Sequence, residues 1–283
     1  MMLRRRPRLR RQSINRLIPN ILTLLALCAG LTAMRFALEQ RFQLAVIALV
    51  IAAVLDGLDG RIARLIGATS RFGAELDSLC DFVCFGVAPA LMLYLWVMNH
   101  GGRFGWAIVL LYAVCAALRL ARFNTALDDD NRPAWTFNYF TGVPVPAGAG
   151  LAILPMIVSF EIGREWLDYP WLIGAWTVLV AVLMVSKIPT FAFKRLRVPH
   201  WMVLPILLLV GTIAAALAAE PWITLMVVGA VYIGSLPVAF YITRNQRHAV
   251  PAGVEPVDDD QPAASPAANP GVVSLTGRRA EPR

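Results

Sequence analysis

Long apolar runs recur along the chain and are separated by short polar segments. Each run has few charged residues and is long enough to cross about 30 Å of hydrocarbon as a helix. The alternation of apolar and polar residues over about ten positions that is typical of a transmembrane β-barrel strand is absent. The pattern predicts eight spanning helices, at residues 18–36, 42–65, 72–98, 104–123, 144–162, 170–188, 201–218 and 221–243. We therefore expect an all-α, polytopic integral membrane helix bundle.

Composition supports this expectation. Hydrophobic residues make up 58% of the 283 positions and charged residues 16%, whereas soluble domains average about 45–50% and about 25%. A soluble globular domain is therefore excluded. The four cysteines are too few for a disulfide scaffold in a chain of this length.

The basic residues are distributed unevenly between the two sides of the predicted membrane. With the N-terminus in the cytoplasm, all but four of the 26 Lys and Arg fall in cytoplasmic segments. The four on the outer side are Arg35, Arg41, Arg103 and Arg164. Such asymmetry follows the positive-inside rule, so the net charge of +8 reflects topology and does not indicate nucleic-acid binding. We expect a multi-pass protein of the cytoplasmic membrane.

Three parts follow from the change in composition along the chain. Residues 1–17 form a basic cytoplasmic N-terminus, and residues 18–243 form the transmembrane domain, which would hold any catalytic site. Residues 248–283 are rich in proline and have no apolar period. Such composition predicts a disordered cytoplasmic tail.

Four aspartates lie in predicted spans, where ionisable residues are costly. Asp56 and Asp59 are near the end of the second span, and Asp77 and Asp81 are in the third. At about 100° per residue, each pair shares one helix face. The short connection at 66–72 makes the two helices antiparallel neighbours, so the acidic faces can meet. Because a charge at the centre of a span costs about 2.5–3.5 kcal/mol, such residues indicate a functional site.

Oxygen ligands of this kind suit Mg²⁺, Mn²⁺ or Ca²⁺. Two divalent ions would balance four carboxylates, and such a pair is common where displacement occurs at phosphorus. Gly57, Gly60 and Gly73 would leave room for a ligand close to the backbone. A packed ion-pair cluster and a divalent-cation transporter are the alternatives. Transport sites tend to lie near the midplane within inverted repeats, whereas this motif lies near one face and occurs once.

The spacing of these residues resembles the signature of the CDP-alcohol phosphatidyltransferases. That signature is Asp-x-x-Asp-Gly-x-x-Ala-Arg, eight residues, then Gly-x-x-x-Asp-x-x-x-Asp, and every fixed position matches between Asp56 and Asp81. The resemblance implies that Asp56, Asp59, Asp77 and Asp81 hold two Mg²⁺ or Mn²⁺ ions and that Asp81 is also the general base. It further implies a homodimer, CDP-diacylglycerol as a substrate and an active site facing the cytoplasm. The positions implied to receive the CDP group are Gly60, Ala63, Arg64 and Gly73.

Other segments are similar to the branch of this family that uses L-serine as the acceptor. These are residues 19–23, 77–90, 119–124 and 140–147. The expected reaction is transfer of the phosphatidyl group to the serine hydroxyl with release of CMP. Asn20, at the head of the first span, is either a helix cap or a contact to the nucleotide.

A serine pocket needs a cation for the carboxylate of its zwitterionic ligand. Arg119 and Arg122, near the cytoplasmic end of the fourth span, suit bidentate contacts of this kind; ordinary positive-inside arginines are the other interpretation. Cys84 stands where this branch is expected to carry Ser, and it shares the arc of Asp77 and Asp81. It is therefore a candidate for the acceptor pocket. Glycerol 3-phosphate, an inositol phosphate and choline remain alternative acceptors.

Overall fold

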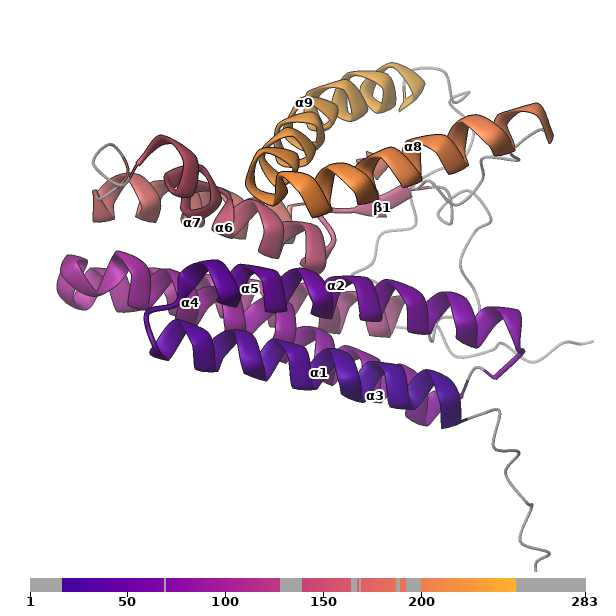
Figure 1. Cartoon of the computed structure of the whole chain (residues 1–283), viewed down its shortest axis with the longest axis horizontal. Helices are drawn as coiled ribbons and strands as arrows, with labels where there is room; N and C mark the ends of the chain where they lie inside the picture. Colours follow the sequence, from indigo (N-terminus) through magenta and orange to yellow (C-terminus); the bar gives the residue numbers. More distant parts are fainter. Residues whose placement is uncertain are drawn as a thin grey trace, which may run out of the picture. The chain divides into compact units, whose positions relative to one another are not determined.

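A computed structural model describes residues 17–68, 70–127, 139–163, 167, 169–186, 189–191 and 200–247 (Figure 1). The predicted N-terminal segment, except for Leu17, and the predicted tail at 248–283 lie outside the described residues. The chain divides into two units, Met1–Arg244 and Asn245–Arg283. Apart from the last turn of the final helix, the elements described below belong to the first unit.

Helices account for nearly all of the described structure, which confirms the predicted all-α class. They are α1 (Leu17–Leu38), α2 (Phe42–Leu65), α3 (Arg71–Asp81), the π-helix η2 (Phe82–Val87), α4 (Ala88–Trp96), the 3₁₀-helix η3 (Met98–Gly101), α5 (Gly102–Leu127), α6 (Val145–Ile162), α7 (Pro170–Val185), α8 (His200–Ala219) and α9 (Pro221–Arg247). Five helical stretches are long and apolar enough to cross a membrane, and three shorter apolar helices complete the predicted eight.

Two short strands were not predicted. β1 (Tyr139–Thr141) pairs antiparallel with β2 (Pro189–Phe191), with Tyr139 opposite Phe191. Gly142 follows β1 with a φ of +82°, and a Cβ there would lie 2.5 Å from the carbonyl oxygen of Met184. The close approach of this segment to the end of α7 therefore requires glycine.

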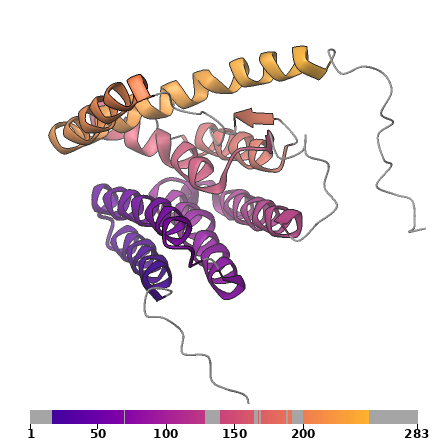
Figure 2. The same ribbon diagram turned by 90° about the vertical axis from the view of Figure 1, so that its right-hand side faces the viewer.

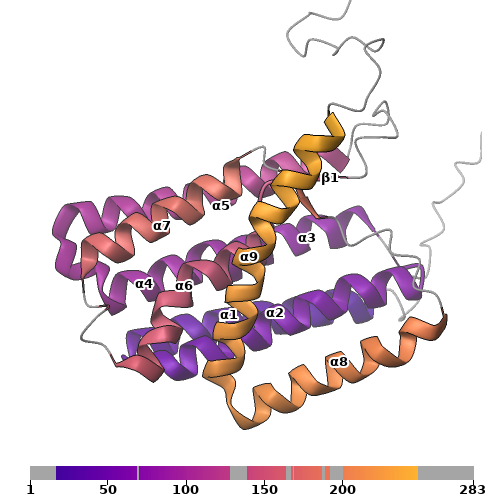
Figure 3. The same cartoon turned by 90° about the horizontal axis from the view of Figure 1, so that it is seen from above.

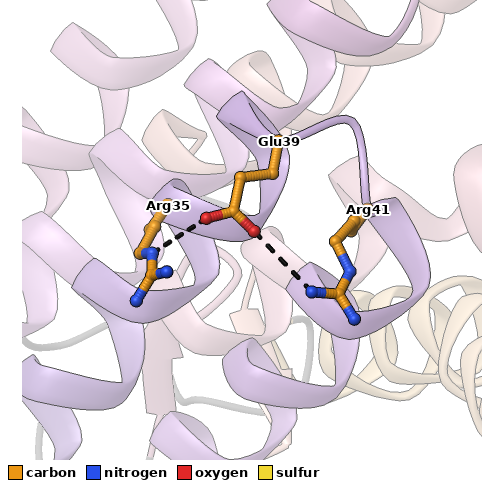
Figure 4. Close-up of polar contacts among 3 residues, drawn as sticks. All are labelled: Arg35, Glu39 and Arg41. Atoms are coloured by element: carbon orange, nitrogen blue, oxygen red, sulfur yellow. Dashed lines mark hydrogen bonds and ion pairs between the residues drawn. The ribbon is translucent and has the colours of Figure 1, made fainter.

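A tight turn joins α1 to α2. Glu39 accepts from Arg35 at 2.9 Å and lies 3.8 Å from Arg41, with all three side chains exposed (Figure 4). Exposed ion pairs of this kind contribute at most about 1 kcal/mol each. The turn makes α1 and α2 antiparallel neighbours along their length.

Helices α1 to α5 pack together and hold the site (Figure 2). α1 contacts α2, α3 and α4, and α5 contacts η2 and α4. α9 crosses α6 (Figure 3). The rings of Phe160 on α6 and Trp222 on α9 pack edge to face, with their centroids 4.8 Å apart. Between α2, α6 and α9 lies a pocket of about 210 Å³ with an almost entirely apolar lining.

The third predicted span differs from a regular α-helix. The sequence predicts one uninterrupted helix over 72–98, but the structure inserts the π-helix η2 directly after Asp81. π-Helical turns are rare and frequently occur at functional sites.

Candidate active site

Three carboxylates from two helices meet near one end of the bundle. Asp56 and Asp59 lie in the last three turns of α2 and Asp77 lies in α3. One carboxylate oxygen from each lies within 4.8 Å of the others. The turn between the helices uses Gly67 at a φ of +61°, and α3 begins with Ser70 accepting from the Gly73 amide at 3.0 Å. The short connection therefore brings the two acidic faces together, as the sequence predicts.

Asp81 is the fourth member of this acidic cluster. It is the last residue of α3, and its carboxyl group lies within hydrogen-bonding range of the Asp56 carboxyl group. Its Oδ1 atom is buried and has no partner among the described residues. Carboxylates this close repel each other unless they share a proton or a cation lies between them.

No side-chain cation neutralises the cluster in the described part of the chain, where both ion pairs involve Glu39 at the other end of α1 and α2. Four carboxylates without a basic partner, all offering oxygen, form a donor set suited to a hard divalent cation. The residues therefore fit the metal-ion role that the sequence predicts for them.

Thr23 on α1 holds one of these carboxylates. Its hydroxyl donates to Asp59 Oδ2 at 2.5 Å, and the two side chains are 4% and 3% exposed. This contact was not predicted, because it joins helices far apart in sequence and the aspartate motif carries no signal of it. Partners of this type orient a ligating carboxylate.

Replacing Thr23 with Val removes this hydrogen bond and nearly preserves the shape of the side chain. We expect Thr23→Val to weaken Mn²⁺ binding by about 10- to 100-fold, the usual effect of losing such a partner. Binding of Mn²⁺ to the purified protein would be measured by titration. Thr32→Val is the matched control, because the Thr32 hydroxyl is exposed and donates only to the Cys28 carbonyl of its own helix. Equal Mn²⁺ affinity in the two variants would contradict the role of Thr23.

The predicted CDP-binding residues on α2 border open space. A Cβ added to Gly60 would meet no atom within 4 Å. Arg64 lies one turn later, exposed, and its Nε donates to the Gly60 carbonyl at 2.9 Å. Ala63 is half-buried beside it. This end of α2 is therefore uncovered by the described protein, and binding of CDP there remains a prediction.

Asn20 and Gly73 lie together although they are 53 positions apart. A Cβ on Gly73 would be 3.1 Å from Asn20 Oδ1 and also 3.1 Å from Ser70 Oγ. Asn20 lies inside α1, which already includes Leu17, so the helix-cap interpretation is wrong. The contact to the nucleotide remains as the predicted role of Asn20.

The two predicted acceptor arginines differ in their surroundings. Arg122 is exposed, and it donates to the Val185 carbonyl at the end of α7 at 2.9 Å. Arg119 is only 7% exposed, its guanidinium lies 5.9 Å from the centre of the Phe123 ring, and its Nε has no partner among the described residues. Arg119 is therefore a buried cation with an unused donor.

Contacts on either side of Arg119 fix its level in the bundle. One turn before it, Ala116 lies 3.2 Å from where a Gly86 Cβ would be. Further along α5, Asn124 Nδ2 donates to Ser78 Oγ at 2.9 Å. Along α5, Arg119 therefore lies between Ala116 and Asn124. Along the third span, Asp81 lies between Ser78 and Gly86, which are the partners of those two residues. A buried carboxylate oxygen and a buried guanidinium nitrogen, both without partners among the described residues, are thus at about the same level.

Cys84 lies against α1. Its Sγ is 3.5 Å from the Ala26 carbonyl oxygen, and a Cβ on Gly30 would be 2.5 Å from the same sulfur. The side chain fills the contact between η2 and α1 and is 1% exposed. Its part in an acceptor pocket remains a prediction.

Comparison with known proteins gives the family. The sequence profile of the CDP-alcohol phosphatidyltransferases matches residues 16–184, which include all four aspartates. The chain belongs to this family. A second phosphatidyltransferase profile, CDP-alcohol phosphatidyltransferase 2, matches residues 201–237, in α8 and α9.

Several relatives within the phosphatidyltransferase family bear the name CDP-diacylglycerol–serine O-phosphatidyltransferase. The protein of Mycobacterium leprae is 41% identical over 86% of this chain and 79% of its own length. That of Mycobacterium tuberculosis H37Rv is 39% identical over 98% and 93%. That of Helicobacter pylori 26695 is 37% identical over 64% and 74%.

Proposed function

We propose that the protein transfers the phosphatidyl group from CDP-diacylglycerol to L-serine and so forms phosphatidylserine and CMP. The serine hydroxyl oxygen bonds to the phosphorus that carries diacylglycerol, and the bond from that phosphorus to CMP breaks. The observation that carries the proposal is the acidic cluster, in which Asp56, Asp59 and Asp77 offer carboxylate oxygens within 4.8 Å of one another. The names of the relatives support the same reaction.

Asp56, Asp59, Asp77 and Asp81 would hold two Mg²⁺ or Mn²⁺ ions. Bound there, the ions would neutralise the diphosphate and stabilise the charge on departing CMP. The uncovered end of α2 around Gly60 leaves space for the CDP group.

Asp81 is the general base in this proposal. Its buried Oδ1 has no partner among the described residues and can accept the proton of the serine hydroxyl. General-base steps typically contribute 10²- to 10⁴-fold.

The apolar pocket supports a lipid substrate. Its lining includes Ala53, one turn before Asp56, and Phe85, one turn after Asp81. An acyl chain in this pocket would therefore begin next to the acidic cluster, where the reacting phosphorus must lie.

Arg119 would bind the serine carboxylate, since it is a buried cation at the level of the proposed base. A phosphorylated acceptor would need more cations in one place, and choline would need an aromatic cage. Serine has one carboxylate and one hydroxyl, which suit one buried guanidinium and one carboxylate oxygen without a partner among the described residues.

Loss of Arg119 should affect one substrate only. Charge-assisted hydrogen bonds contribute about 1.5–3 kcal/mol, so Arg119→Ala should raise KM for serine roughly tenfold to 150-fold and leave KM for CDP-diacylglycerol nearly unchanged. Steady-state CMP release measures both constants. Arg103→Ala, at the other end of α5, is the control. An unchanged KM for serine, or an equal rise for both substrates, would contradict this assignment.

The protein is embedded in a membrane through its apolar helices; we propose the cytoplasmic membrane, with the active site facing the cytoplasm. The distribution of basic residues supports this orientation. In a cysteine-free background, a cysteine at Gly101 should react with an impermeant maleimide added outside cells, and one at Arg195 should not. Labelling at Arg195 from outside would refute the eight-span topology. The proposal also includes a homodimer, which cross-linking in membranes would test.

A further inference from the structure

The π-helix η2 connects the catalytic part of the third span to its buried part. Asp77 and Asp81 precede η2, and α4, which is packed in the core, follows it. A π-helical turn contains an additional residue. It therefore changes how the helix before it is rotated relative to the helix after it, and the direction in which Asp77 and Asp81 point depends on η2.

Pro89 explains why regular α-helical bonding is incomplete at this place. In an α-helix the amide of residue 89 would donate to the carbonyl of Phe85, but proline has no amide hydrogen. The preceding residue, Ala88, donates five positions back, to the Val83 carbonyl. The Phe85 carbonyl thus lacks its α-helical donor, and it lies in the bundle interior, where an unpaired carbonyl is costly.

Tyr112 on α5 supplies a donor. Its side chain is completely buried, and its hydroxyl donates to the Phe85 carbonyl at 2.9 Å. One turn further along α5, Ala116 packs where Gly86 leaves room. The packing would hold η2 close to α5 without Tyr112, and the Tyr112 hydroxyl adds a hydrogen bond to the Phe85 carbonyl.

We propose that Tyr112 is a positioning residue for phosphatidyl transfer, because its hydroxyl holds η2 in the register that directs Asp81 toward Asp56. Tyr112 itself touches no substrate in this account. The inference rests on the proposed function, since it assigns Tyr112 an effect on the reaction in which Asp81 is the base.

Tyr112→Phe removes only the hydroxyl. Misplacement of a catalytic group by about 1 Å can cost about 100-fold in rate, so we expect kcat to fall about 10- to 100-fold while KM for CDP-diacylglycerol stays within about twofold of the wild type. Thr177→Val is the matched control: its hydroxyl is also fully buried and donates to the Ile173 carbonyl at 2.7 Å, but on α7. Both variants should lose similar thermal stability, measured as Tm in detergent. A kcat of Tyr112→Phe equal to that of the control would overturn the proposal.

Pro89→Ala provides a second test that removes no buried hydrogen bond. It gives residue 89 an amide that can donate to Phe85 and so competes with Tyr112 for the carbonyl. We expect Tm to rise and kcat to fall, a combination that damage to the fold would not produce. A wild-type kcat in Pro89→Ala would overturn the proposal even if Tyr112→Phe failed to fold. CMP release by the wild type with serine distinguishes failure of the proposed function from failure of the role of Tyr112. No CMP release by the wild type would contradict the proposed function. An active wild type with fully active variants would contradict only the role of Tyr112.

Discussion

Replacing any one of Asp56, Asp59 and Asp77 with Asn should lower turnover by more than about 100-fold. Loss of a residue that only hydrogen-bonds to a metal ligand typically costs about 10- to 100-fold in activity, and loss of the ligand itself should cost more. The three carboxylates are mutually within 4.8 Å, and the described residues include no basic partner for them. Each substitution keeps the size of the side chain and removes one negative charge. CMP release from CDP-diacylglycerol and serine is the measurement.

Chelation should have the same effect as these substitutions. Activity should vanish in EDTA and return when Mg²⁺ or Mn²⁺ is added in excess. Glu39→Gln is the control, because Glu39 is also an acidic residue of the helix bundle but pairs with Arg35 in the α1–α2 turn. Near-wild-type activity in EDTA, or in any of the three Asn variants, would refute the assignment of the cluster as a metal site.

Asp81→Asn should separate binding from proton transfer. Asn cannot serve as a base at this position, so we expect a fall in kcat of about 10²- to 10⁴-fold. The variant should still bind CDP-diacylglycerol and Mn²⁺, because three carboxylates remain. Rapid-quench measurement of a single turnover would isolate the chemical step. A general base contributes at least about 100-fold. An Asp81→Asn variant that kept more than about a tenth of the wild-type rate would therefore show that Asp81 is not the base.

The helical class and the approximate positions of the apolar spans could be predicted because they depend on local properties. The length of an apolar run and the polar turn that follows it are both properties of consecutive residues. The predicted helix at 42–65, for example, matches α2 (Phe42–Leu65) at both ends. The meeting of Asp56 and Asp59 with Asp77 follows from helix periodicity and a short turn. No knowledge of packing was needed for either prediction.

Contacts between helices distant in sequence could not be predicted in this way. Thr23 reaches Asp59 only because α1 and α2 pack at a particular rotation, and Tyr112 reaches Phe85 for the same reason with α5 and η2. The π-helix η2 was not predicted either. Pro89 lies within an apolar run, and the pattern of that run predicts one continuous helix.

The two arginines show the same limit. Arg119 and Arg122 are the same residue type three positions apart, and the sequence gives no reason to prefer either. Packing buries Arg119 and leaves Arg122 exposed against the end of α7. The difference in burial is what makes Arg119 the better candidate for the serine carboxylate.

The acceptor is the central claim, because the four-aspartate motif is common to phosphatidyltransferases that use different alcohols. The most direct measurement is the initial rate of CMP release by the purified protein with CDP-diacylglycerol and Mn²⁺. L-serine, glycerol 3-phosphate, an inositol phosphate and choline would each be supplied at the same concentration. We expect serine to give the fastest release, with phosphatidylserine as the lipid product. A faster reaction with any of the other three alcohols would contradict the claim.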